Sequence, residues 1–184
     1  LEKAQEYNIP AVTYEKRAPL PKEFQSGRSV LIATYSALFH GQSKFGVRGD
    51  GKSVEMVAGI ILDDAHVAFS TMRDAFTLTI DKATFPNEYA ELTNSFRNDF
   101  RELGKVGSFD DIVNGLDYGV LEVPYWSWKE KAAQVREYLR KMDKFPFTWP
   151  LLRDAFDYCH CLIGKDSFVI TPLFPLVDLI PTFD

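Results

Sequence analysis

The first third of the chain sets short apolar runs between polar connections, a pattern typical of strands joined by loops. It predicts strands at Ala11–Tyr14, Ser29–Tyr35 and Val57–Leu62. The last two are apolar nearly throughout, as expected for parallel strands covered on both faces. A helix is predicted over Leu1–Asn8, and another over about residues 67–76. This order favours parallel strands with short connections.

Helical periodicity takes over beyond about residue 80. Pro86 to Leu103 and Trp126 to Met142 each place apolar residues on one helical face. Further helices are predicted from Ser108 and from about Trp149. Short strands are predicted at Thr77–Ile80, Val120–Val123, Tyr158–Ile163 and Ser167–Thr171. The predicted fold class is α/β, a parallel sheet formed by residues 1–80 and 159–184 and interrupted by a mostly helical insertion over 81–158.

Composition narrows the class of protein. Hydrophobic residues make up 46% and charged residues 26% of 184 residues, which is typical of a soluble domain. No apolar run approaches the roughly 18 residues of a membrane span, so no membrane contact is expected. The net charge of −5 argues against a protein that coats nucleic acid by charge alone. The chain does not begin with Met and is charged from the start, so we expect a piece of a longer, cytoplasmic protein.

Cys159 and Cys161 flank His160 and would share one face of a strand. A zinc site built on these three would need a fourth ligand, and only His40 and His66 remain among the histidines. Packing of two small side chains in a core strand is the favoured interpretation.

Residues Gly46 to Ser53 match the phosphate-loop pattern G-x-x-x-x-G-K-[ST]. A working phosphate loop follows a strand and opens a helix, whose N-terminus helps to hold the phosphates. Here the chain after Ser53 runs directly into the predicted strand Val57–Leu62, which leaves no room for a helix. We therefore predict a glycine-rich surface loop in which Lys52 binds no nucleotide.

The strand Val57–Leu62 ends in Asp63, Asp64, Ala65 and His66. A buried strand that delivers carboxylates at its end is one way to place a magnesium ligand beside a catalytic base. The same two acids could instead form a turn or cap the next helix. The residues alone leave both interpretations open.

The order of the two strands resembles the first motor domain of DEAD/DEAH-box (superfamily 2) helicases. The run from Val30 to Leu38, with Thr34 and Tyr35 at the strand end, is followed after roughly 30 residues by Asp63-Asp64-Ala65-His66. The resemblance covers about residues 1–75 and implies a partial RecA-like sheet. It also implies a nucleic-acid-dependent ATPase as the parent protein, with a second motor domain in the same chain.

The resemblance assigns roles residue by residue. Asp63 would hold Mg²⁺ through water, Asp64 would orient the attacking water, and His66 would link the nucleotide site to the second motor domain. Thr34, with Tyr35 beside it, would contact a DNA or RNA backbone. Asp64 stands where the family has Glu and is one methylene shorter, so slow hydrolysis and none at all both stay open. The resemblance implies that ATP and Mg²⁺ are cofactors of the parent protein. Because the phosphate loop of that family is not expected within this chain, we expect the chain to bind ATP and Mg²⁺ only weakly and to be inactive alone.

The insertion is the part that the resemblance explains least. Its aromatic stretches Tyr125–Trp128 and Phe145–Trp149 could stack on single-stranded bases or simply pack a core. Arg136 and Arg140 share a helical face and are candidate phosphate contacts. The alternative function is therefore an interaction module, in which the insertion docks a partner protein or nucleic acid and the acidic motif is a relic.

Overall fold

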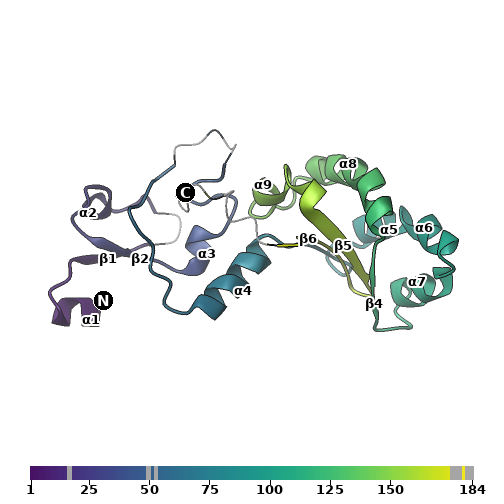
Figure 1. The fold of residues 1–184 in the computed structure, drawn as a ribbon, viewed down its shortest axis with the longest axis horizontal. Coiled ribbons are helices and arrows are strands. Elements are labelled where there is room, and N and C mark those ends of the chain that lie inside the picture. The colour runs from purple at the N-terminus through teal and green to yellow at the C-terminus, as the bar shows by residue number, and fades with distance from the viewer. Residues whose placement is uncertain (16–17, 49–50, 52–53, 175–179, 181–184) are drawn as a thin grey trace. The chain divides into compact units, whose positions relative to one another are not determined.

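The computed structural model describes residues 1–15, 18–48, 51, 54–174 and 180. The chain divides into two compact units, and Figure 1 shows the elements of both. The first holds Leu1–Met72 and, among the described residues near the C-terminus, Ile180. The second begins at Arg73 and includes the remaining described residues to 174. Each unit is described by itself.

The first unit contains a parallel pair of strands, β1 (Ala11–Thr13) and β2 (Val30–Ile32). Backbone hydrogen bonds from Val30 N to the Pro10 carbonyl and from Tyr14 N to the Ile32 carbonyl extend the pairing. The helices are α1 (Glu2–Glu6), α2 (Lys22–Gln25), α3 (Tyr35–Leu38) and α4 (Ala65–Ala75), the last of which continues into the second unit. Two of the three strands predicted in this part of the chain are thus present and run parallel, but β2 is not covered on both faces, since Val30 and Ile32 are 55% and 40% exposed.

The predicted strand Val57–Leu62 is wrong. Residues 54–64 form neither helix nor strand, and the side chains of Ile60 and Ile61 are 37% and 97% exposed. A parallel strand satisfies its backbone groups only by pairing with neighbours. The sheet formed by the described residues of this unit contains β1 and β2 alone, so the apolar run has no partner and stays irregular.

The loop after α3 is packed closely. The Ser43 hydroxyl donates to the Ala37 carbonyl at 3.0 Å and accepts from Phe45 N at 3.2 Å. Gly46 has a φ of 84°, and a Cβ atom built there would lie 2.6 Å from Cγ2 of Val54. Only glycine satisfies both the positive φ and the close approach.

The second unit is built on an antiparallel sheet in the order β3-β6-β5-β4. The strands are β3 (Leu78–Asp81), β4 (Val120–Glu122), β5 (Cys159–Gly164) and β6 (Ser167–Pro172). Burial alternates along β5 and β6, so one face of the sheet forms core and the other is partly exposed. All four strands match short strands predicted from the sequence.

Helices cover the buried face of this sheet, and α5, α7 and α8 contact its strands (Figure 1). Their bounds are Pro86–Asn94 for α5, Arg97–Glu102 for α6, Val106–Val113 for α7 and Tyr125–Met142 for α8. The chain then forms α9 (Trp149–Leu152) and the 3₁₀ helix η1 (Phe156–Tyr158). Trp128 is 1% exposed, stacks between Phe96 and Phe156, and donates from Nε1 to the Phe156 carbonyl at 3.2 Å.

The long helix predicted over Pro86–Leu103 is two helices. Thr93 Oγ1 donates to the Tyr89 carbonyl at 2.7 Å, and Ser95 Oγ donates to the Leu92 carbonyl at 2.6 Å. Side-chain hydroxyls that compete for helical carbonyls favour a bend. The break at Ser95 lets the next helix turn while Phe96 stays fully buried.

The fold is therefore mixed α/β, with one parallel pair of strands and one antiparallel sheet. The unit boundary lies at residues 72–73 rather than at the predicted 81. The strands β5 and β6 were expected to continue the parallel sheet, but they pair with β3 and β4. Residues 159–172 form a hairpin of β5 and β6, and long-range antiparallel pairing of β6 with β3 and of β5 with β4 joins this hairpin to the rest of the second unit.

Candidate functional site

The acidic segment lies at the start of α4. Asp64 Oδ1 accepts hydrogen bonds from the backbone N–H groups of His66 at 3.0 Å and Val67 at 3.3 Å, and the Asp64 carbonyl accepts from Ala68 N at 2.9 Å. This is the geometry of an N-cap, in which a short acid satisfies the unpaired donors of the first helical turn. The capping role left open by the sequence is therefore present.

Tyr35 connects this turn to the end of β2. Its hydroxyl accepts a hydrogen bond from Asp64 N at 2.9 Å, across 29 positions of sequence. Thr34 precedes Tyr35 and its Oγ1 lies 3.1 Å from Ser36 Oγ, with the Thr34 side chain exposed. The structure thus brings Tyr35 into contact with the acidic turn, a contact that the sequence did not predict.

Asp63 and His66 are exposed, and the Asp63 carboxylate makes no hydrogen bond to another described residue. Over the described part of the chain, no three His, Cys, Asp or Glu side chains cluster in the manner of a protein-only metal cage. Mg²⁺ commonly keeps several waters and takes only one or two carboxylates besides substrate phosphates. The Asp63 carboxylate, which has no hydrogen-bond partner among the described residues, and Oδ2 of Asp64 could serve as such carboxylate ligands.

The segment that matches a phosphate loop is only partly described. Gly46 and Val47 are buried, whereas residues 49–50 and 52–53, Lys52 among them, lie outside the described residues. The predicted exclusion of Lys52 from nucleotide binding stays a prediction.

The residues singled out in the insertion separate by burial. Trp128 belongs to the core, whereas Tyr125 and Trp126 are 66% and 62% exposed at the start of α8. Arg136 and Arg140 are also exposed on α8. Arg140 pairs with Glu137, and this hydrogen bond lowers the pKa of Glu137 from 4.5 to about 2. Arg136 has no partner among the described residues.

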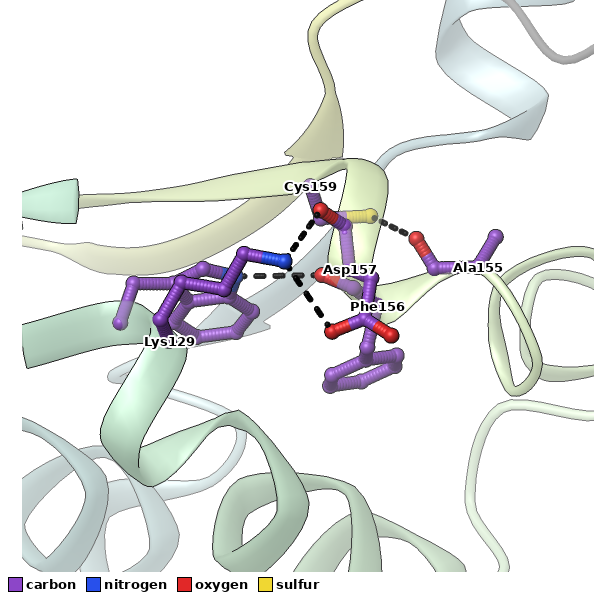
Figure 2. Close-up of polar contacts among 6 residues, drawn as sticks. Lys129, Ala155, Phe156, Asp157 and Cys159 are labelled. Atoms are coloured by element: carbon purple, nitrogen blue, oxygen red, sulfur yellow. Dashed lines mark hydrogen bonds and ion pairs between the residues drawn. The ribbon is translucent and has the colours of Figure 1, made fainter. Parts of the chain in front are cut away.

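A set of contacts that the sequence did not indicate joins α8 to η1, as Figure 2 shows. Lys129 Nζ lies 3.4 Å from both the carbonyl and Oδ1 of Asp157, and 5.7 Å from the centre of the Tyr125 ring. Lys129 and Asp157 are 28 positions apart, and no local sequence pattern predicts their contact. The cluster fixes Tyr125 beside a cation at the surface.

Cys159 and Cys161 are buried, as the core interpretation predicted. Cys159 Sγ donates to the Ala155 carbonyl at 3.4 Å (Figure 2), and burial raises the pKa of its thiol to about 12. His160 points to the other face of the sheet, with Nδ1 2.9 Å from Glu122 Oε1. The three side chains are therefore not directed at one point.

None of the helices in the described ranges combines the length and apolar character that crossing a bilayer requires. Scans of family models, curated proteins and solved structures found no match to this chain.

Proposed function

We propose that this chain is part of the first motor domain of a nucleic-acid-dependent ATPase of the DEAD/DEAH-box helicase type. The observation that carries the proposal is the hydrogen bond between Tyr35 and the backbone of Asp64. It ties the segment that would contact a nucleic-acid strand to the segment that would act on ATP. Binding at one segment can then bias the position of the other, which is what coupling between the two sites requires.

Within this function, each residue of the acidic turn would have its own role. Asp63 would hold Mg²⁺ through water, and the ion would supply charge stabilisation at the transferred phosphoryl group. Asp64 would orient the attacking water with Oδ2, because Oδ1 caps α4. Thr34 would contact a DNA or RNA phosphate, and His66, exposed on the first turn of α4, would face the second motor domain.

The test is the ATPase rate of the full-length parent protein carrying single substitutions in the turn. Asp63→Asn should abolish nucleic-acid-stimulated hydrolysis. Asp64→Asn should do the same while keeping the cap, because Asn caps helices about as well as Asp. Asp64→Glu, which restores the family residue, should raise turnover. Asp74→Asn, at an exposed acid farther along α4, is the matched control and should leave the rate unchanged.

A second function is favoured by one observation, the capping geometry itself. If Asp64 serves only α4, the chain is an interaction module, and Asp64→Asn should leave both ATP hydrolysis and strand separation intact. If the Asp63→Asn and Asp64→Asn variants both retain nucleic-acid-stimulated ATP hydrolysis, the motor proposal is overturned. The isolated 184-residue chain should show no ATPase activity under either function.

A further inference from the structure

Helix α8 differs in charge from the rest of the molecule. Its 18 residues carry five Lys or Arg and two Glu, a net charge of +3, whereas the whole chain has a net charge of −5. One face, formed by Ser127, Trp128, Ala132, Val135 and Leu139, is buried. The opposite face carries exposed cations, among them Lys129, Arg136 and Arg140.

Three of the five cations and an aromatic ring lie on one flank of this helix. At 3.6 residues per turn, Tyr125, Lys129, Arg136 and Arg140 fall within about 60° of the helix circumference. The contact of Lys129 with the Tyr125 ring confirms that the first two share a flank. Between them and the arginines stands Ala133, which is exposed and has a small side chain. From Tyr125 to Arg140 the stripe is about 22 Å long.

Two of these side chains are held in place by acidic partners. Lys129 is tied to Asp157 of η1, and Arg140 is held by two hydrogen bonds to Glu137, each 2.8 Å long (Figure 2 shows the first contact). Arg136 lies between them, exposed and without a partner among the described residues.

We infer that this flank of α8, here called the α8 stripe (Tyr125, Lys129, Arg136 and Arg140), binds single-stranded nucleic acid. The guanidinium groups take backbone phosphates, and the Tyr125 ring stacks on an unpaired base. Positive charge along a line with an aromatic ring at one end is the combination used by non-specific single-strand binding surfaces. The inference rests on the proposed function, since a strand-separating motor releases single strands that need a path.

The experiment measures fluorescence anisotropy of the 184-residue chain with labelled oligo(dT) and oligo(U) of about twelve nucleotides. Titrations run between roughly 50 and 200 mM salt, without ATP. Arg136→Gln combined with Arg140→Gln should weaken binding and reduce the salt slope by about 1.4, from two lost phosphate contacts. Arg136→Lys combined with Arg140→Lys should keep most of the binding. The two oligonucleotides decide between DNA and RNA.

Controls are matched in charge and chemistry. Lys141→Gln removes a cation of α8 that lies off the stripe, and its salt slope should stay unchanged. Tyr125→Ala should weaken binding roughly 5- to 160-fold, the range of one stacked base. Tyr118→Ala, a similarly exposed tyrosine after α7, should not weaken it. Circular dichroism checks that each variant keeps its helix content.

Three results would overturn the inference. The first is no oligonucleotide binding by the unmodified chain, and the second is an equal loss of binding in Lys141→Gln and in the double Gln variant. The third is displacement of the oligonucleotide by poly-glutamate together with unchanged binding in Tyr125→Ala. The last would identify an acidic protein as the ligand. Asp63→Asn separates this inference from the proposed function, because it should leave oligonucleotide binding by the chain intact. Retained ATPase activity in the Asp63→Asn parent would sink the motor proposal and leave the binding result standing.

Discussion

Removal of the Asp64 side chain tests whether the acidic turn supports α4. Asp64 Oδ1 accepts the N–H groups of the second and third helical residues, His66 and Val67. Asp64→Ala leaves both donors without this acceptor and should cost about 1 kcal/mol of local stability. Asp64→Asn keeps the acceptor and loses only the favourable charge at the helix N-terminus, about 0.3–1 kcal/mol. Asp63→Ala should change stability by less than about 0.5 kcal/mol, because its side chain is exposed and makes no described contact.

Hydrogen exchange of the α4 amides, followed by mass spectrometry, measures this effect locally and needs no assumption that both units unfold together. A loss of 1 kcal/mol raises the exchange of the first turn about fivefold. The expected order of exchange is Asp64→Ala fastest, Asp64→Asn intermediate, and Asp63→Ala equal to the unmodified chain. Equal exchange in Asp64→Ala and Asp63→Ala would refute the capping role, and with it the claim that only Oδ2 is left for chemistry.

Three further predictions concern packing and charge. Trp128→Ala should destabilise the second unit by about 3–5 kcal/mol, because it empties a buried aromatic stack; Trp126→Ala, at an exposed neighbour, should barely shift the urea midpoint. Gly46→Ala should cost more than Gly27→Ala, since both have positive φ but only Gly46 also meets a close side chain; equal thermal shifts would contradict this. The lowered pKa of Glu137 implies stability that is present above pH 4.5 and lost as pH falls toward about 2. Glu137→Gln should flatten the stability curve in that window, and an unchanged curve would count against the ion pair.

Sequence patterns located most elements because their causes are local. Alternating burial along Cys159–Gly164 and the apolar face of Tyr125–Met142 both follow from the periods of strand and helix, and both elements are present. The capping role of Asp64 was one of two interpretations that the sequence left open, since a short acid before a helix can cap it. The pairing partner of each strand depends on residues far away in the sequence. For this reason the expected continuation of the parallel sheet beyond residue 159 was wrong, and β5 and β6 pair antiparallel.

For the acidic motif too, some features could be predicted from the sequence and others depended on tertiary structure. Its residue types and their spacing from Thr34 can be read from the sequence, and their resemblance to helicase motifs suggested an acidic ATP-site motif and a strand-binding segment. The sequence also predicted that Val57–Leu62 would be a strand, because a run of apolar residues has the right composition. Whether such a run becomes a strand depends on a neighbour to take its hydrogen bonds, and here the described residues offer none. Tertiary structure alone decided that Tyr35 holds the backbone of Asp64 and that Lys129 meets Asp157, because each contact joins positions nearly 30 residues apart.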